Sequence, residues 1–352
     1  MDALTNPLRI ANGINLKLFN PLFPSISNTR FSSRSIKSIV TCSSTLTTTP
    51  TSTKLQRRPQ NVDGEFYVNH ECIDCDVCRW MAPETFQRID GQSAVYKQPT
   101  SCKERTAALQ ALLSCPVASI RTEKPPSDIL EVHSTMPLAI DERSLPGVYH
   151  CGYHSKKSYG ATSYLIKHPE GNILVDSPSY KGKLASQIEA LGGARYMFLT
   201  HRDDVADNDK WARRLSCDRI LHKYEIEPHT ANVETKLEGQ GPWSLGPEID
   251  LIFTPGHTEG SVSLFYKPLK ALFTGDHLAA SPNGELVYSE IYNFYSVEKQ
   301  LENIHALLKL DFLWILPGHG RRIQFKSIAE KNAAIEKLLQ KTAFNGYNLQ
   351  LV

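Results

Sequence analysis

The stretch Thr254-Pro255-Gly256-His257-Thr258 closes a short apolar run with a histidine, and this arrangement recurs along the chain. Similar runs end at Thr200-His201, at Thr274-Gly275-Asp276 and at Pro317-Gly318-His319. Short apolar runs bounded by turn residues predict buried β-strands. Residues at strand ends gather along one edge of a sheet, so these side chains can converge although consecutive ones lie 56, 19 and 43 positions apart. Imidazole and carboxylate groups ligate zinc, iron or manganese, so the sequence predicts a metal site there.

The region around these runs alternates predicted strands with predicted helices. Strands are expected over residues 147–154, 163–175 (with a turn at 169–172), 195–200, 250–254, 271–274 and 312–316, and helices over 183–191 and 326–339. A Pro-rich joint, Lys124-Pro125-Pro126, and a polar stretch precede this pattern. The sequence therefore predicts a linker over residues 124–143 and a domain over residues 144–352.

The four ligand-bearing motifs resemble those of the metallo-β-lactamase fold, which the glyoxalase II and flavodiiron branches share. Ile173-Leu174-Val175-Asp176 matches a further family element, in which the Asp is structural and lies beside the site. The resemblance runs from about Leu145 to Gly320. It implies an α+β architecture, an αββα sandwich of two β-sheets covered by helices, with metal at the sheet edge. It also implies an ester, thioester, lactam or phosphoester substrate.

The first family motif, usually HxHxDH, is altered in this chain to His201-Arg202-Asp203-Asp204-Val205-Ala206-Asp207-Asn208. Without gaps, Asp203 replaces the second His; with a two-residue slip, Asp207-Asn208 corresponds to the terminal Asp-His pair. A carboxylate at the second position resembles the flavodiiron branch, whose metals are iron, and oxygen ligands favour iron or manganese over zinc. The alternative is that Asp203 or Asp204 caps a helix that runs to Cys217. The expected metal ligands are His201, Asp203, Asp207, His257, Asp276 and His319, and the three acids among them are the candidate catalytic residues.

A second group of potential ligands lies nearer the N-terminus. Cys72-Ile73-Asp74-Cys75-Asp76-Val77-Cys78 places three thiols on one short loop, and Cys115-Pro116 follows after 36 residues. This spacing, with Pro after the last Cys, is typical of an iron–sulfur cluster. Ala82 stands where a two-cluster protein carries its next Cys, so one cluster is expected. The alternative is a structural zinc site, which normally shows two separated Cys pairs.

Residues from about Glu65 to Arg121 resemble the single-cluster bacterial-type 4Fe–4S ferredoxins. The resemblance rests on the cysteines, on Pro83, on a hairpin-like segment at residues 86–95 and on residues 115–120. It implies a small α+β ferredoxin-like domain, placed at residues 61–123, in which Cys72, Cys75, Cys78 and Cys115 bind the cluster. Some relatives add a disulfide, but Ala82 occupies the place of a partner for Cys102, which is expected to be a buried or free thiol.

The formal net charge of +2 at pH 7 is the sum of two unlike segments. Residues 1–60 carry eight basic side chains, one acid and 18 Ser or Thr, whereas the remaining residues have a net charge of −5. Such a segment cannot bury enough apolar surface to offset its ordering entropy, so disorder is expected. Its composition is typical of a chloroplast transit peptide, with Val40-Thr41-Cys42 resembling a stromal processing site and residues 47–59 a linker. We therefore expect a stromal protein; an ordinary solvated tail is the alternative.

Charge and hydropathy also exclude some partners. No stretch offers the ~20 apolar residues that span a bilayer. An acidic mature chain argues against broad nucleic-acid affinity, which depends on phosphate neutralisation. The expected partners are a small-molecule substrate and, for a redox protein, an electron-transfer partner.

Several further side chains have two interpretations. Arg321 and Arg322 follow the last metal motif and either hold an anionic substrate or lie on a solvated face, which we favour. His277 either faces substrate or supports the site from behind. The aromatic residues of this region either wall a substrate channel or pack in the core, which is favoured; they are Tyr288, Tyr292, Phe294 and Tyr295.

Three functions are compatible with this organisation. The first is a metal-dependent hydrolase in which one or two metal ions, zinc or iron, generate hydroxide near neutral pH. The second is a redox enzyme in which the cluster feeds electrons to a di-iron site. The third is a non-catalytic iron–sulfur sensor. Metal content, measured without oxygen, separates these hypotheses.

Overall fold

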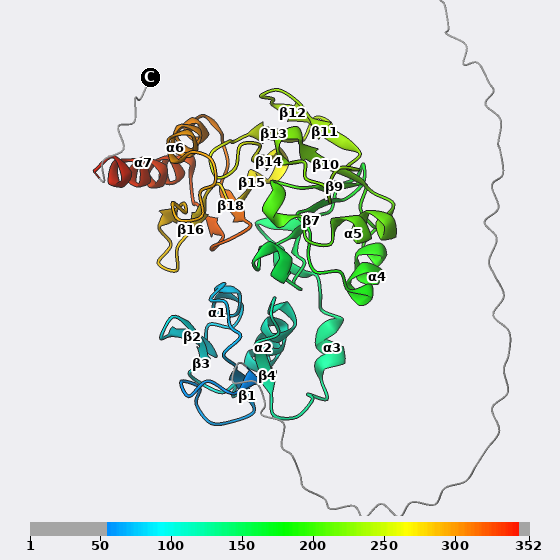
Figure 1. Cartoon of the computed structure of the whole chain (residues 1–352), viewed down its shortest axis with the longest axis vertical. Coiled ribbons are helices and arrows are strands. Elements are labelled where there is room, and N and C mark those ends of the chain that lie inside the picture. The colour runs from blue at the N-terminus through cyan, green and yellow to red at the C-terminus, as the bar shows by residue number, and fades with distance from the viewer. Residues whose placement is uncertain (1–54, 345–352) are drawn as a thin grey trace, which may run out of the picture. The chain divides into compact units, whose positions relative to one another are not determined.

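The computed structural model describes residues 55–344, all within one compact unit, Pro50–Val352 (Figure 1). The predicted transit peptide and disordered segment fall mainly on residues 1–54, which lie outside the described residues. No helix among the described residues is long and apolar enough to cross a membrane.

A small α+β region holds the cysteine motif. Strand β1 (Phe66–Val68) pairs antiparallel with β4 (Ile120–Thr122), and β2 (Phe86–Ile89) forms a hairpin with β3 (Gln92–Val95). Asp90 and Gly91 form the two-residue turn of that hairpin and both have positive φ, as a turn of this kind requires. Helices α1 (Val77–Met81) and α2 (Cys102–Ser114) pack on these strands around Phe66, Val68, Phe86, Val95 and Leu109. The hairpin predicted at residues 86–95 is present.

The segments on either side of this region are also structured. Arg58, which the predicted boundary left outside the domain, is buried and donates hydrogen bonds to the carbonyl groups of Ser93 and Ile89. Residues 124–143, predicted as a linker, contain α3 (Ile129–His133) and β5 (Leu138–Asp141). Because β5 pairs with β6, this segment adds an edge strand to the larger sheet.

Two sheets form the second region. The first has seven strands in the order β11 (Thr235–Leu237), β10 (Asp218–His222), β9 (Tyr196–Phe198), β8 (Ile173–Val175), β7 (Tyr164–Ile166), β6 (Leu145–His150) and β5. It is parallel from β8 to β11 and antiparallel elsewhere. The second has six strands in the order β12 (Trp243–Ser244), β13 (Ile249–Phe253), β14 (Val262–Tyr266), β15 (Ala271–Gly275), β18 (Trp314–Pro317) and β19 (Ile323–Gln324). A short ribbon, β16 (Ala279–Ala280) with β17 (Leu286–Val287), lies beside it.

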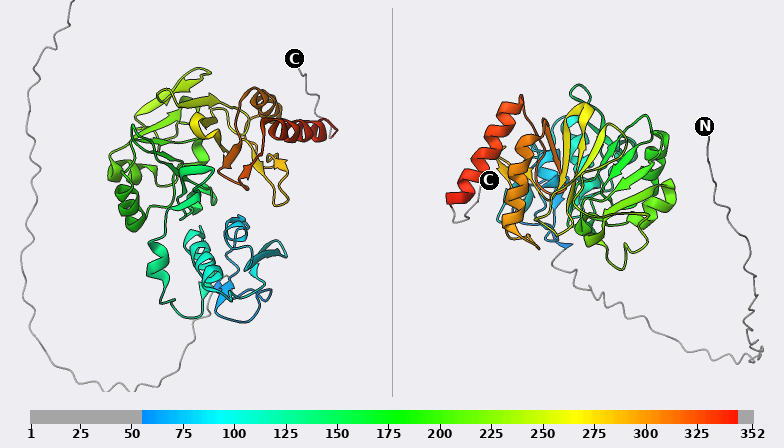
Figure 2. Two further views of the ribbon diagram at one scale, coloured as in Figure 1. Left: turned by 180° about the vertical axis from the view of Figure 1, so that it is seen from behind. Right: turned by 90° about the horizontal axis from the view of Figure 1, so that it is seen from above.

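Helices cover the outer faces of both sheets (Figure 2). Helices α4 (Gly182–Ala190) and α5 (Asn208–Leu215) share an apolar cluster with the seven-stranded sheet. Helices α6 (Val297–Ala306) and α7 (Ile328–Phe344) share another with the six-stranded sheet. A third cluster, which includes Val175, Phe198, Leu264 and Phe273, joins the inner faces of the two sheets. The predicted αββα sandwich is confirmed.

Candidate functional site

The first group of site residues follows strand β9. Leu199 and Thr200 continue from the strand, His201 is buried, and a 3₁₀-helix, Arg202–Asp204, turns the chain sharply. The turn brings Asp203 Oδ2 to 3.8 Å from His201 Nε2 and to 3.5 Å from His257 Nε2. His257 lies just beyond β13, so residues from the two sheets meet at this point.

Asp276 connects this group to His319. Its Oδ2 atom lies 3.9 Å from His201 Nε2, 3.7 Å from His257 Nε2 and 2.8 Å from His319 Nδ1. Asp276 follows β15 and His319 follows β18, which is the parallel neighbour of β15, so both side chains emerge at one edge of the six-stranded sheet. One carboxylate therefore faces three imidazoles.

Two overlapping sets of potential ligands result. Ligand atoms of His201, Asp203 and His257 lie within 4.8 Å of one another, as do those of His201, Asp204 and Asp276. Within these sets, Nε2 of His201 and His257 and both carboxylate oxygens of Asp204 are buried and have no hydrogen-bond partner among the described residues. The same is true of Nε2 of the neighbouring His319. Buried polar groups are normally paired. Unpaired nitrogen and oxygen atoms that converge in this way fit one or two metal ions.

The structure changes the assignment of the acids in the first motif. Asp207, predicted as a ligand and catalytic residue, is not brought to the site: its carboxylate accepts hydrogen bonds from Lys157, Lys210 and the Tyr180 backbone. Asp204, which the sequence left open between a helix cap and a ligand, is fully buried and belongs to the second ligand set. The helix begins later, at Asn208, so neither Asp203 nor Asp204 caps it. The signal in the sequence that could have identified Asp204 as a ligand is its position directly after Asp203 on a tight turn.

Asp176 supports the site from beneath, as the resemblance implied. It accepts hydrogen bonds from the Thr200 backbone at 2.8 Å and from Thr200 Oγ1 at 3.0 Å, and that hydroxyl lies 3.0 Å from His201 Nδ1. This chain of contacts holds the His201 ring with Nε2 directed at the carboxylates. Burial raises the pKa of Asp176 to about 8, although the hydrogen bonds from Thr200 oppose that rise.

Glu225 fixes the loop that carries Arg202 and Asp203. It is fully buried, and its two oxygens accept hydrogen bonds from the backbone of Arg202 at 2.9 Å and of Gly260 at 2.6 Å. The loops after β9 and β13 are thereby tied together, and these loops supply His201 and His257.

The electrostatics of the metal-free site reflect the crowding of acids and imidazoles. Burial lowers the pKa of His201 to about 4. Burial also lowers the pKa of His319, but the charge and hydrogen bond of Asp276 outweigh it and raise the value to about 10. Asp204 has a pKa well above its usual range because of burial and the nearby Asp276. Burial raises the pKa of Asp203, but the contacts with His257 and His201 outweigh this effect and leave the pKa below its usual value. The carboxyl group is therefore ionised and available as a ligand.

The four motif cysteines of the smaller region also converge. Cys72, Cys75, Cys78 and Cys115 line one small cavity together with apolar residues, and all four are free thiols. Burial raises the pKa of Cys75 to about 12, with smaller contributions from Cys115 and Cys72. Thiols that are so buried and close together keep their protons in the absence of metal and release them when a metal binds to the sulfurs. The backbone amides of Ser93 and Ser119 point at the sulfurs of Cys72 and Cys115, at 3.4 and 3.2 Å, as in iron–sulfur sites.

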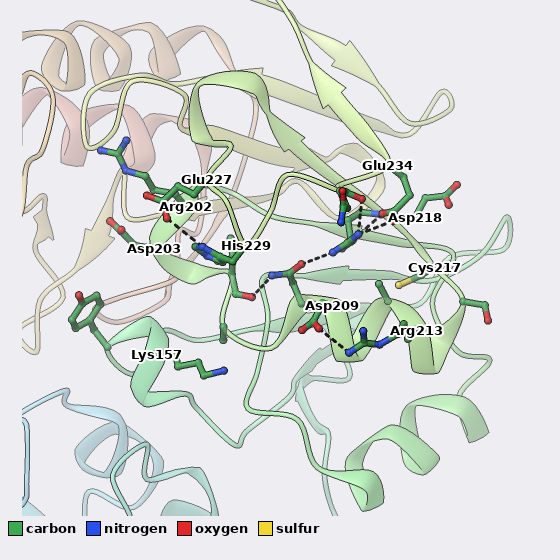
Figure 3. A pocket seen from close by; sticks show the side chains of 18 residues that line it. Lys157, Arg202, Asp203, Asp209, Arg213, Cys217, Asp218, Glu227, His229 and Glu234 are labelled. Carbon is green, nitrogen blue, oxygen red and sulfur yellow. Dashed lines mark hydrogen bonds and ion pairs between the residues drawn. The ribbon is translucent and has the colours of Figure 1, made fainter. Parts of the chain in front are cut away.

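A groove of about 1000 Å³ opens beside Asp203 (Figure 3). Arg202, Tyr159 and Lys157 line it near the metal ligands. Farther along, its charged residues form ion pairs with one another, Arg213 with Asp209 and Arg219 with Glu234, and His229 Nδ1 lies 3.5 Å from Glu227 Oε2. Among the described residues, no ion pair includes the Arg202 guanidinium, so the free cation of the groove lies next to the metal ligands.

Other residues with two interpretations can now be placed. Arg321 and Arg322 do not face the groove: Arg321 pairs with Asp76, and Arg322 lies 4.6 Å from the centroid of the Trp80 ring. The aromatic segment does not pack in the core as a whole. Ile291, Tyr292, Phe294 and Tyr295 are exposed, and the Phe294 ring lies 5.8 Å from the His257 ring.

His277 is fully buried behind the site. Neither of its ring nitrogens has a hydrogen-bond partner among the described residues, and burial lowers its pKa to about 3, with a smaller contribution from His257. It therefore stays neutral and does not reach the groove, which agrees with a role behind the ligands rather than in substrate contact.

Comparison with known proteins supports both regions. Residues 68–122 match a family described as the 4Fe-4S single cluster domain of ferredoxin I, and residues 159–319 match the metallo-beta-lactamase superfamily. A curated relative, "Beta-lactamase-like protein 2 homolog" of Caenorhabditis elegans, is 27% identical over 173 residues, covering 46% of this chain and 53% of that protein. The chain thus spans about half the length of this relative.

Solved structures of metallo-β-lactamases are also similar. The DIM-1 metallo-β-lactamase is 16% identical, with a TM-score of 0.41, over 54% of this chain and 94% of that chain. An archaeal metallo-β-lactamase superfamily protein from Sulfolobus tokodaii is 17% identical, with a TM-score of 0.39, over 55% of this chain and 83% of that chain. The motifs, the sandwich and the family matches together show that this chain carries a single-cluster 4Fe-4S ferredoxin domain followed by a metallo-β-lactamase superfamily domain.

Proposed function

We propose that the second domain is a metal-dependent hydrolase that acts on an ester, thioester, lactam or phosphoester. The observation that carries this proposal is the convergence of unpaired, buried ligand atoms beside an open groove. His201, Asp203 and His257 would hold one ion, and Asp204, Asp276 and His319 a second, with Asp276 close enough to both groups to bridge them. When bound, such ions lower the pKa of a coordinated water and polarise the substrate carbonyl or phosphoryl group.

The residues of the chain have distinct roles in this proposal. Asp203 is partly exposed and lines the groove, so its carboxylate meets substrate and water at the entrance of the site. Thr200 and Asp176 hold the His201 ring, which fixes one ligand direction before substrate arrives. Glu225 keeps the loops of His201 and His257 together.

The groove favours a substrate with an anionic group and an apolar part. Among the described residues that line the groove, Arg202 has no ion-pair partner for its guanidinium, and a guanidinium binds carboxylate or phosphate groups in two parallel hydrogen bonds. Tyr159, which lines the groove and whose backbone contacts His319, is 68% exposed. Phe294 is not part of the groove lining, but it is 60% exposed and its ring lies 5.8 Å from the His257 ring. These rings can cover an apolar portion of the substrate.

The types of ligand in the site also indicate which metal it binds. Three carboxylates and three imidazoles make a harder ligand set than the all-histidine arrangement, so we propose iron or manganese in preference to zinc. Elemental analysis of protein purified without oxygen tests this choice, and stoichiometric zinc at the second domain would contradict it.

The hydrolase proposal is tested with a panel of chromogenic esters, thioesters, lactams and phosphodiesters. Asp203→Asn should abolish turnover, because Asp203 both binds metal and faces the groove. Asp209→Asn is the matched control, since Asp209 lines the same groove but pairs with Arg213. Turnover that persists in Asp203→Asn, or that does not depend on added metal, would sink the proposal.

We further propose that the protein acts in the chloroplast stroma. The proposal rests on the basic, acid-poor and Ser/Thr-rich composition of residues 1–60. Sequencing the N-terminus of the mature protein tests it, and a mature chain that begins well before Arg30 would contradict it.

A further inference from the structure

The loop of residues 155–162 lies between a cluster ligand and a metal ligand. Gly160 packs directly on Cys75: a methyl group built on Gly160 would lie 3.0 Å from Cys75 Cβ and 3.4 Å from Cys75 Sγ. Two residues later, the Thr162 backbone donates a hydrogen bond of 2.7 Å to the carbonyl group of Gly318, which precedes the metal ligand His319. One van der Waals contact, a few covalent bonds and one hydrogen bond therefore connect the two centres.

The contact between the domains is held by residues that flank the ligands. Asp76 follows the cluster ligand Cys75, and Arg321 stands two residues after His319. The Arg321 guanidinium donates to both carboxylate oxygens of Asp76, at 2.8 and 3.2 Å. Paired hydrogen bonds between charged groups define distance and orientation together. The ion pair thus clamps one ligand loop against the other.

Buried rings surround the same contact. His154 Nδ1 lies 2.7 Å from the Gly160 carbonyl oxygen, and its Nε2 lies 2.8 Å from His150 Nε2. The His150 ring is 5.0 Å from the Trp80 ring, whose face Arg322 covers. Both histidines are buried, as are Gly160 and Thr162, so this part of the route is held in place and shielded from solvent.

We propose that this loop is an electron-transfer route between the ferredoxin cluster and a redox-active metal ion held at Asp276 and His319. An external one-electron donor, a soluble iron–sulfur or flavin carrier, reduces the cluster and is itself oxidised. The cluster then returns to its oxidised state as a trivalent iron or manganese ion in the site becomes divalent. No bond is made or broken and no proton is transferred in this exchange. The inference rests on the metal site of the proposed function but not on hydrolysis.

The first test compares two metals in the full chain. The protein is purified without oxygen so that it keeps its cluster, and the site of Asp276 and His319 is then loaded with either ferric iron or zinc. One electron equivalent of dithionite is mixed in, and the visible absorbance and the paramagnetic resonance of the cluster are followed. With iron, the reduced-cluster signal should decay at a rate independent of protein concentration. With zinc it should persist, because zinc has no redox chemistry in proteins. Equal persistence with both metals overturns the proposal.

The second test probes the route itself. Gly160→Ala forces a methyl group onto Cys75, and Arg321→Gln opens the clamp without altering a ligand residue. Each should slow the decay on the order of tenfold, about 1.4 kcal/mol in the barrier. Gly193→Ala is the control for the first, since Gly193 also has positive φ but has no atom near its methyl position. Arg214→Gln is the control for the second, because Arg214 forms an exposed ion pair with Glu189.

Both controls should decay as the wild type does. Arg321→Gln keeps the test decisive if Gly160→Ala fails to retain its cluster. Unchanged decay in Arg321→Gln would show that the electron does not pass through this contact. A failure of the hydrolase proposal leaves these results untouched, since the readouts are spectroscopic and need no substrate.

Discussion

Replacing Asp204 by asparagine should shift the stability of the metal-free and the metal-loaded protein in opposite directions. In the metal-free protein Asp204 is fully buried, its oxygens have no partner among the described residues, and Asp276 repels its charge. An unpaired buried polar group costs ~1–3 kcal/mol, and more when it is charged. Because the raised pKa favours the neutral acid, a neutral amide gains most at alkaline pH, where Asp204 has to ionise. There we expect Asp204→Asn to stabilise the metal-free protein by ~1–2 kcal/mol, which raises the melting temperature of a domain of this size by a few degrees.

In the metal-loaded protein the same change removes a ligand. Loss of an outer partner of a metal site already weakens binding ~10–100-fold, so loss of a direct ligand should weaken it at least as much. Because bound metal stabilises the native state in proportion to the logarithm of its affinity, the stabilisation by metal should fall by at least ~1.4–2.7 kcal/mol. At alkaline pH the variant should therefore melt above the wild type without metal and gain less when metal is added.

Differential scanning fluorimetry with and without metal, together with elemental analysis, measures both effects. Asp207→Asn is the matched control, because Asp207 binds Lys157, Lys210 and a backbone amide rather than metal. It should lower the melting temperature of both forms and leave the metal content unchanged. Full metal content in Asp204→Asn, with loss of metal in Asp207→Asn, would refute the ligand assignment.

Three further predictions concern other parts of the chain. Asp176 keeps its proton in the metal-free native protein up to about pH 8, whereas an unfolded Asp loses it near pH ~4, so the free energy of unfolding should fall as pH rises through this window. Asp176→Asn should flatten that fall in urea titrations. Lys331→Met should lower the free energy of unfolding by ~1–3 kcal/mol, seen as a lower urea midpoint. The substitution leaves the backbone carbonyl groups of Leu307 and Leu308 without their buried donor. Cys115→Ser should abolish the visible absorbance of the cluster, whereas Cys102→Ser should keep it, because Cys102 is exposed and lies outside the cluster cavity.

The strands that carry ligands could be predicted because each is an apolar run that ends at a turn. The structure places strands at β9, β13, β15 and β18, where the runs are, and brings His201, His257, Asp276 and His319 together at their ends. The hairpin at residues 86–95 and the helix at residues 183–191 follow from equally local signals. Burial and short turns dominate in these segments, and both can be read over a few residues.

The acids of the first motif could not be resolved in the same way. Asp203, Asp204 and Asp207 lie on one tight turn and the start of a helix, where a shift of one residue redirects each carboxylate. The partner that removes Asp207 from the site is Lys157, 50 positions earlier in the chain. No local pattern reports such a long-range pairing. The exposure of Tyr292, Phe294 and Tyr295 could not be predicted for a related reason. The spacing of aromatic residues along the sequence does not show which of them lack a packing neighbour in the fold.

For the two basic residues after His319, the favoured interpretation, a solvated face, was wrong, because Arg322 packs on the Trp80 ring and Arg321 pairs with an acid. The alternative was that they hold an anionic substrate, but the anion that Arg321 holds is Asp76 of the same chain. Because Asp76 follows Cys75, and Arg321 lies two residues from His319, any displacement of this ion pair moves both ligand loops at once. A carrier domain joined only by a flexible tether has no need of such a clamp. The Arg321–Asp76 ion pair therefore fixes the loop of Cys75 against the loop of His319, which is the arrangement that the proposed electron-transfer route requires.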